Sequence, residues 1–373
     1  MTMRSSRATW IFGVLLFSSP PADGAERWEA EWERTVKAAR GEGQVTVYVF
    51  AGGPELPIRA EVFQKRFPEI KVVMVSGDPV PRILAERRAG KYIADVVIGG
   101  PTTPWTLYLA KALDPLKDAM ILPEVLDDSK WWHGKHRWTD MEKRYAFPFL
   151  GNPQRGEFFY NTQLIHPKDF QSFWDFVNPK WKGKIEARDI RSPGPGSVVM
   201  RFFLHTPGLG PQFIKRFFSE MEITLFRDRR QAVNWLASGK YPICFLCNST
   251  DVGRAKEQGL PVNEFGEMKE GVGIASSGGN VGLVNRAPHP NAAKVFVNWL
   301  LSREGQITVQ MSYAKVGNPV NSLRIDIPKD GIPPADRLRE GVSYIEVETP
   351  ERMSMELALK VFNEALAEAE RRK

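Results

Sequence analysis

The sequence is poor in the residues that metal centres and disulfide-stapled folds require. It has two cysteines, Cys244 and Cys247, and five histidines in 373 residues. A disulfide framework needs more cysteine pairs, so the chain must bury a hydrophobic core, and its hydrophobic fraction of 42% allows this. The HExxH, GxSxG and P-loop patterns are absent from the sequence. We therefore expect a protein that is not an enzyme of these common classes.

Long apolar runs are missing beyond the first 25 residues. The segment "WIFGVLLF" (10–17) follows two arginines and precedes "ADGA", which ends at Ala25. This order is typical of a secretory signal peptide over residues 1–25. The run is shorter than the roughly 20 apolar residues of a membrane-spanning helix. Because no cysteine lies near the cleavage site, we expect an exported, soluble chain that is not a lipoprotein.

Positive charge exceeds negative charge but forms no block. The formal net charge is +7, and lysines and arginines are scattered among acids. Without a long basic block or a basic–aromatic strip, nucleic acid is not predicted as a partner. A mildly positive surface favours anionic solutes, although ordinary solubility explains the charge equally well.

Apolar stretches of strand length alternate with helical patterns along the chain. The predicted strands are 44–50, 71–77, 94–100, 156–164, 182–189 and 241–246, and a strand-like stretch at 272–284 has a Gly-rich break. A later helix is predicted to start at an Asn291 cap. Strands that alternate with helices form right-handed crossovers and mostly parallel sheets. The fold class is therefore α/β, with two doubly wound lobes.

Gly-rich or hydroxyl-rich turns follow four of these strands, at 51–54, 99–103, 192–197 and 247–250, and a fifth turn is at 276–280. Ligands of open α/β sheets bind beyond the carboxyl ends of the strands, where helix N-termini present free N–H groups. Each turn alone also fits a plain structural turn. The ligand-binding candidates in these turns are Ala51, Gly52, Gly53, Gly100, Thr102, Thr103, Ser192, Gly196, Ser197, Cys247, Asn248, Ser249, Ser277, Gly278 and Asn280.

Four further segments carry a family resemblance. They are "FFYNTQLI" (158–165), "FWDFVNPKWKGKIEARD" (173–189), "DRRQAVNWLASGKYPICF" (228–245) and "SSGGNVGLVNRAPHPNAAKVFVNWLLSREGQ" (276–306). In this order they resemble periplasmic solute-binding proteins of ABC importers, of the iron(III)-type branch with the type II fold.

The resemblance implies two discontinuous lobes, residues 26–157 plus 274–316 and residues 158–273 plus 317–373, with a ligand cleft between them. It implies a periplasmic monomer with no cofactor and no catalytic role. Such a protein captures a small molecule or anion and delivers it to an ABC permease in the inner membrane.

The sequence departs from the ferric members of that family. These typically hold iron with adjacent tyrosines just after the strand predicted at 241–246, and the sequence there is "ICFLCNST". A small anion such as a carboxylate, phosphonate or sugar phosphate is therefore the expected ligand. Ferric iron held by other ligands or by a synergistic anion is one alternative. Trp131, Trp132 or Trp138 covering a flat or cationic ligand, such as thiamine or a polyamine, is another.

Three further hypotheses concern single side chains. Arg155 could bind an anionic ligand through two hydrogen bonds, or pair with a surface acid. Cys247, before the helix opened by Ser249, could be the nucleophile of a thiaminase-like enzyme on the same fold. The two cysteines could instead bind zinc with His133 and His136, although the spacing is not that of a zinc finger. A local disulfide between them would need a bend in the strand.

Overall fold

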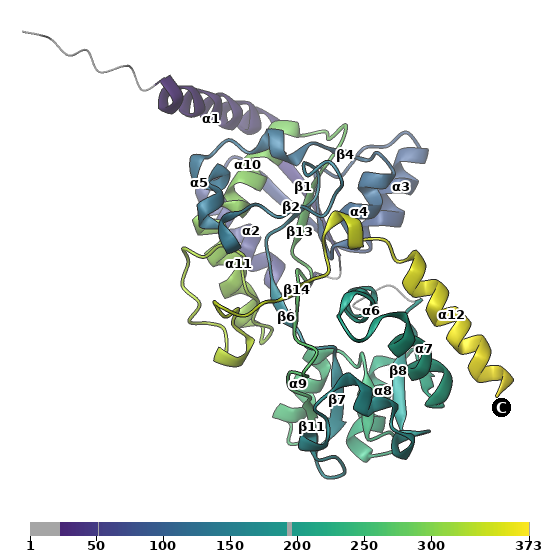
Figure 1. Cartoon of the computed structure of the whole chain (residues 1–373). Helices are drawn as coiled ribbons and strands as arrows, with labels where there is room; N and C mark the ends of the chain where they lie inside the picture. Colours follow the sequence, from purple (N-terminus) through teal and green to yellow (C-terminus); the bar gives the residue numbers. More distant parts are fainter. Residues whose placement is uncertain (1–22, 51, 192–195, 373) are drawn as a thin grey trace, which may run out of the picture.

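The computed structural model describes residues 23–50, 52–191 and 196–372. Most of the predicted signal peptide, residues 1–22, is outside the described residues. The predicted site residues Ala51 and Ser192 are also outside them. Figure 1 shows two lobes, with strands β6 and β14 lying between them. The mixed α/β architecture confirms the predicted fold class.

The first lobe is built on a sheet with the strand order β2-β1-β3-β13-β4, and β5 also pairs with β13. β1 is almost fully buried because its sequence, QVTVYVF, is apolar on both faces. The elements are α1 (Asp23–Glu42), β1 (Gln44–Phe50), α2 (Glu55–Arg66), β2 (Lys71–Gly77), α3 (Pro79–Arg88), β3 (Val96–Gly99), α4 (Thr102–Leu109), β4 (Leu113–Asp114), α5 (Pro123–Leu126), β5 (Phe147–Pro148), β13 (Asn280–Val284), α10 (Pro290–Leu301) and α11 (Arg303–Lys315).

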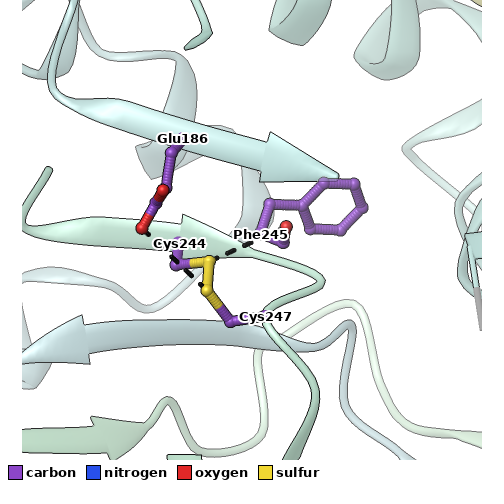
Figure 2. Close-up of a disulfide and its surroundings, with 4 residues drawn as sticks. All are labelled: Glu186, Cys244, Phe245 and Cys247. Carbon is purple, nitrogen blue, oxygen red and sulfur yellow. Dashed lines mark hydrogen bonds between the residues drawn. A yellow bond between two sulfur atoms is a disulfide. The ribbon is translucent and has the colours of Figure 1, made fainter. Parts of the chain in front are cut away.

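The second lobe is built on a sheet with the strand order β11-β7-β10-β8-β9. Its core is rich in phenylalanine, and the rings of Phe158 and Phe176 stack 3.8 Å apart. Cys244 and Cys247 form a disulfide in this lobe (Figure 2). The elements are β7 (Phe158–Asn161), β8 (Ile185–Arg188), α6 (Gly196–His205), α7 (Gly210–Glu220), β9 (Thr224–Phe226), α8 (Arg229–Ser238), β10 (Ile243–Phe245), α9 (Ser249–Glu257), β11 (Val262–Glu264) and α12 (Glu356–Arg371).

A third sheet joins the lobes, with the strand order β14-β12-β6. It consists of β6 (Asn152–Gln154), β12 (Gly273–Ala275) and β14 (Ile345–Glu346). β12 pairs with β6 antiparallel and with β14 parallel. Each of the three chain crossings between the lobes therefore passes through one sheet. Within the described residues, no helix is long and apolar enough to cross a membrane.

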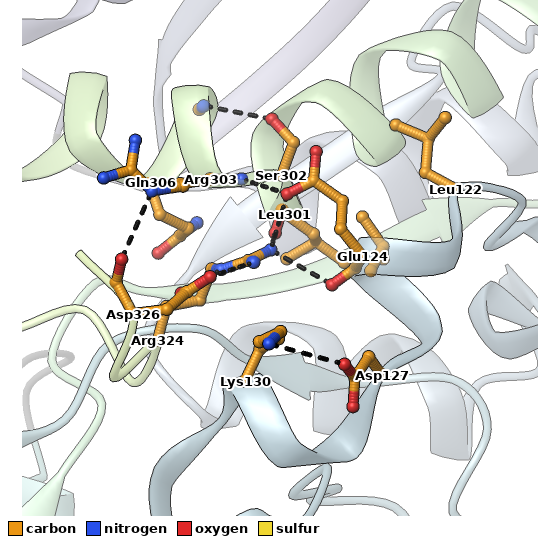
Figure 3. Close-up of polar contacts among 12 residues, drawn as sticks. Leu122, Glu124, Asp127, Lys130, Leu301, Ser302, Arg303, Gln306, Arg324 and Asp326 are labelled. Carbon is orange, nitrogen blue, oxygen red and sulfur yellow. Dashed lines mark hydrogen bonds and ion pairs between the residues drawn. The ribbon is translucent and has the colours of Figure 1, made fainter.

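The segment after α11 differs from the sequence expectation, which assigned residues 317–373 to the second lobe. Val320, Leu323 and Tyr344 pack in the first-lobe core. Arg324 is buried, donates a hydrogen bond to the Leu301 carbonyl at 3.1 Å and pairs with Asp326 at 2.8 Å (Figure 3). The chain therefore leaves the first lobe at β14 rather than near residue 317. Only its last part, with α12 packed on α7, joins the second lobe.

Candidate functional site

The carboxyl edge of the second-lobe sheet brings three helix N-termini together. β9, β8 and β10 are parallel neighbours, so their carboxyl ends meet at one edge. They are followed along the chain by α8, α6 and α9 respectively. The first N–H groups of a helix have no partner within it, and its N-terminus is partially positive. This edge is therefore suited to an anion.

Four of the residues predicted from the sequence lie at this edge. Gly196 and Ser197 form the first turn of α6, and Ser249 begins α9. Asn248 is the N-cap of α9, and its side-chain oxygen accepts a hydrogen bond from the Asp251 N–H at 3.2 Å. Its φ of 78° places it in the left-handed region, which asparagine tolerates well. The structure therefore brings these four predicted residues to one sheet edge.

Two arginines at the same edge were missed by the sequence analysis. Arg188 ends β8, and Arg229 begins α8, where it pairs with Asp251 at 2.7 Å. Burial and the neighbouring charge of Arg229 lower the pKa of Arg188, while Glu157 opposes this. Burial raises the pKa of Glu157 to about 7. Arg188 lies one residue before the end of the strand predicted at 182–189, close to the position where ligand-binding side chains gather, and this was the signal that could have found it.

The first lobe has a corresponding edge. β1 and β3 are parallel, are followed by α2 and α4, and place the turns at 52–54 and 99–103 together. β13 starts there, because Asn280 pairs with Gly99. Gly100 lies against the third turn, since an added Cβ would be 3.2 Å from the Ser277 carbonyl oxygen. The turns at 52–54, 99–103 and 276–280 therefore form one surface.

Several predicted groups in these turns bond within the protein. The Gly53 N–H donates to the Glu55 carboxylate at 3.0 Å. Thr103 is buried, its N–H donates to the Gly100 carbonyl at 2.9 Å, and its side chain fills the space beside Gly99. The buried Asn280 side chain donates to the Ser276 hydroxyl. Gly53, Thr103 and Asn280 therefore stabilise the turns through these hydrogen bonds and do not offer the same donor groups to a ligand.

Ser277 and Gly278 remain accessible in the 276–280 turn, Ser277 being exposed. The Ser277 hydroxyl accepts a hydrogen bond from Asn152 on β6 at 2.9 Å. Both carboxylate oxygens of Glu348, just after β14, accept from the Ser276 N–H, at 3.0 and 3.1 Å. The turn is therefore tied to β6 and to the segment just after β14.

Arg155 is used inside the protein. It pairs with Asp336 at 3.1 Å and approaches Glu267 to 3.9 Å, and it donates a hydrogen bond to the Ala335 carbonyl. Its side chain is only 14% exposed. Pairing with acids of the chain is thus the observed role, and ligand binding by Arg155 is not supported.

Cys247 is neither a free thiol nor accessible. It is fully buried and bonded to Cys244. The bend that a local disulfide requires is present, because Leu246 has a φ of 64°. A disulfide sulfur cannot act as the thiolate nucleophile. The prediction that the Cys247 side chain contacts a ligand is therefore wrong for this oxidised state, and the alternative hypothesis of a Cys247 nucleophile is not supported.

The aromatic and histidine candidates are structural. Trp131, Trp132 and Trp138 all pack in the first-lobe core, which leaves none of them to cover a ligand. His136 lies 2.8 Å from Asp128 and 2.9 Å from the Val125 carbonyl oxygen, while the cysteines lie in the other lobe. The structure does not bring the two histidines and the two cysteines together.

Comparisons with known proteins agree with this geometry. The family model for bacterial extracellular solute-binding proteins matches residues 50–307, which is more than half of the chain. The chain therefore belongs to this family. Its role is that of a solute-binding protein, which fits the two-lobe fold. Among curated sequences, none matches the chain.

Solved structures of periplasmic binding proteins share the fold. The periplasmic binding protein P5PA is similar with a TM-score of 0.63 and 17% identity, over 88% of this chain and 99% of that one. AfuA from Actinobacillus pleuropneumoniae, solved with fructose-6-phosphate, has a TM-score of 0.63 and 20% identity, over 88% and 99%. Iron-bound HitA from Pseudomonas aeruginosa has a TM-score of 0.62 and 18% identity, over 86% and 99%.

Proposed function

We propose that this protein binds a small anionic solute in the periplasm, between its two lobes, and delivers it to an ABC permease without chemical change. The proposal depends most on one observation. The N-termini of α6, α8 and α9 converge with Arg188 and Arg229 at one sheet edge. A carboxylate, phosphonate or phosphate group is the ligand that such an edge favours.

The first lobe supplies the second contact surface. Exposed Ser277 and partly exposed Gly278 offer a hydroxyl and main-chain groups from a turn that is fixed by Asn152 and Glu348. A ligand that touches both surfaces stabilises the closed arrangement through its differential contacts. The sheet that joins the lobes is the natural place for the movement, because all three chain crossings pass through it.

Ferric binding through adjacent tyrosines has no support from the residues after β10. The positions there are Leu246, Cys247 and Asn248, and the cysteine is buried in its disulfide. Fe(III) prefers hard oxygen ligands, which these side chains do not provide as a set. A small anion therefore remains the better candidate.

The experiment is a thermal-shift screen followed by calorimetry on the mature protein. The panel contains sugar phosphates, phosphonates, dicarboxylates, thiamine, a polyamine, and ferric iron with and without citrate. A ligand that binds only the native state raises its apparent stability. Arg188→Met should abolish binding of the anion found in this way. Arg216→Met, which removes a partly exposed arginine of α7, is the matched control and should not abolish binding. Binding only to thiamine, the polyamine or ferric iron without citrate would refute the proposal.

A further inference from the structure

A second group of chemically notable side chains is buried within the second lobe. Glu186 on β8 and Cys244 on β10 are register partners in a parallel strand pair, so their side chains lie side by side. Cys247 turns back toward them after Leu246 (Figure 2). The ligand-donating atoms of the three residues all lie within 4.8 Å of one another. The Glu186 Oε1 atom is 4.0 Å from the Cys247 sulfur.

The environment of Glu186 is unusual for a carboxyl group. Glu186 and both cysteines are 0% exposed, and the cysteines pack among apolar side chains such as Phe159, Phe226 and Leu236. Glu186 Oε2 has no hydrogen-bond partner among the described residues. Buried polar atoms are nearly always paired, and an unpaired one is destabilising. The position of this carboxyl beside two sulfur atoms therefore calls for a role other than stability.

We propose that Glu186, Cys244 and Cys247 form a buried site for one thiophilic divalent cation, such as Zn²⁺, when the disulfide is reduced. A dithiol reductant supplies the two electrons and two protons: its own sulfurs form a cyclic disulfide, the Cys244–Cys247 bond breaks, and two thiols result. The cation then replaces the protons of the two thiols, which are released to solvent. In the oxidised protein the sulfurs are not thiolates, so the site is closed.

The observed geometry is close to what such a cation needs. Zinc binds thiolate sulfur at about 2.3 Å and carboxylate oxygen at about 2.0–2.2 Å, in a tetrahedral arrangement. Ligand atoms at those distances are separated by roughly 3.5–3.8 Å. The 4.0 Å between Glu186 and Cys247 is near this range, and breaking the disulfide lets the two sulfurs move apart. The site is independent of the proposed solute, because none of its three side chains lies among the solute contacts.

The test uses the mature chain produced in a reducing cytoplasm, with two free thiols per chain verified by titration. Cadmium is the probe, because thiolate-to-metal absorption in the ultraviolet reports each bond to sulfur. The reduced protein should bind one Cd²⁺ per chain, Zn²⁺ should displace it, and the oxidised protein should show no such absorption. Glu186→Gln should weaken Cd²⁺ binding at least about tenfold. Glu264→Gln, a partly buried carboxyl on β11, is the matched control and should leave it unchanged.

Failure of the folded, reduced protein to bind cadmium one to one would overturn the proposal. The proposal would also be overturned if the oxidised protein, or the reduced Glu186→Gln variant, bound Cd²⁺ as tightly as the reduced wild-type protein. If Glu186→Gln does not fold, as judged by circular dichroism, X-ray absorption of the cadmium-loaded wild-type protein decides. Two sulfur ligands with oxygen support the proposal, and fewer than two sulfur ligands contradict it.

Discussion

A buried charge pair near the joining sheet allows a quantitative prediction. Arg201 on α6 is fully buried, and none of its three guanidinium nitrogens has a hydrogen-bond partner among the described residues. Burial lowers the pKa of Arg201, and the charge of Glu348 opposes this. Burial raises the pKa of Glu348, which Arg201 counteracts. Glu348 is therefore the acidic group whose charge opposes the effect of burial on Arg201, and both side chains are buried.

The perturbation is Glu348→Gln, which keeps the shape and can still accept from the Ser276 N–H but removes the charge. Removing one partner of a buried ion pair costs about 3–5 kcal/mol, because the other charge is left uncompensated. Among the described residues no hydrogen bond or ion pair joins Arg201 directly to Glu348, so we expect a smaller loss, below about 3 kcal/mol. The double variant Arg201→Met/Glu348→Gln removes both charges, and it should regain most of this loss.

Urea unfolding of the wild type, both single variants and the double variant gives the coupling free energy. A partly exposed ion pair supplies the matched control. Glu220→Gln, which breaks the Arg216–Glu220 pair at 3.1 Å, should cost less than about 1 kcal/mol. If the loss in the double variant equals the sum of the two single losses within about 0.5 kcal/mol, the two charges do not interact. That result would refute the prediction.

Three further outcomes are expected. Asn248→Ala removes the α9 cap and should lower the free energy of unfolding by about 1 kcal/mol, measured by urea titration, and an unchanged midpoint would count against the cap. The raised pKa of Glu157 means that its proton stabilises the fold at low pH and that this contribution is lost as pH rises through about 7. Glu157→Gln should therefore make the melting temperature depend less on pH between pH 5 and pH 8. An unaltered dependence on pH would exclude Glu157 as its cause. Arg324→Met leaves Asp326 without its partner and should release the segment after α11 to proteolysis, whereas wild-type cleavage rates would contradict its anchoring role.

The sequence predicted the parallel strands and the turns after them because these features are local. The strand at 44–50 matches β1, and the segment at 71–77 matches β2. Both contain apolar runs of strand length, which is a direct signal for a strand; β1 is buried, whereas β2, at the edge of the sheet, is only partly buried. The turns at 196–197 and 248–249 were likewise found because hydroxyl and glycine residues follow a strand and open a helix.

The parts that sequence reasoning missed depend on distant partners. The Asn291 cap was wrong, because α10 begins at Pro290 and Asn291 instead donates to Glu42 of α1 at 2.7 Å. The last crossing from the first lobe to the second was predicted near residue 317, which is too early. The contact of Arg324 with the Leu301 carbonyl keeps this segment on the first lobe, and no local sequence pattern shows that contact. Arg155 was listed as a ligand-binding candidate for the same reason, because its partner Asp336 is far away in the sequence. Such contacts follow from tertiary packing rather than from periodicity.

The most direct test of the account is a crystal structure with the tightest-binding anion from the screen. We predict that its charged group lies at the N-termini of α6 and α9, within hydrogen-bonding distance of Arg188, and that its other side contacts the turn at 276–280. An anion bound elsewhere, for example in the pocket lined by Lys182, Arg191 and residues of α7 and α12, would contradict the central claim that the second-lobe sheet edge captures the solute.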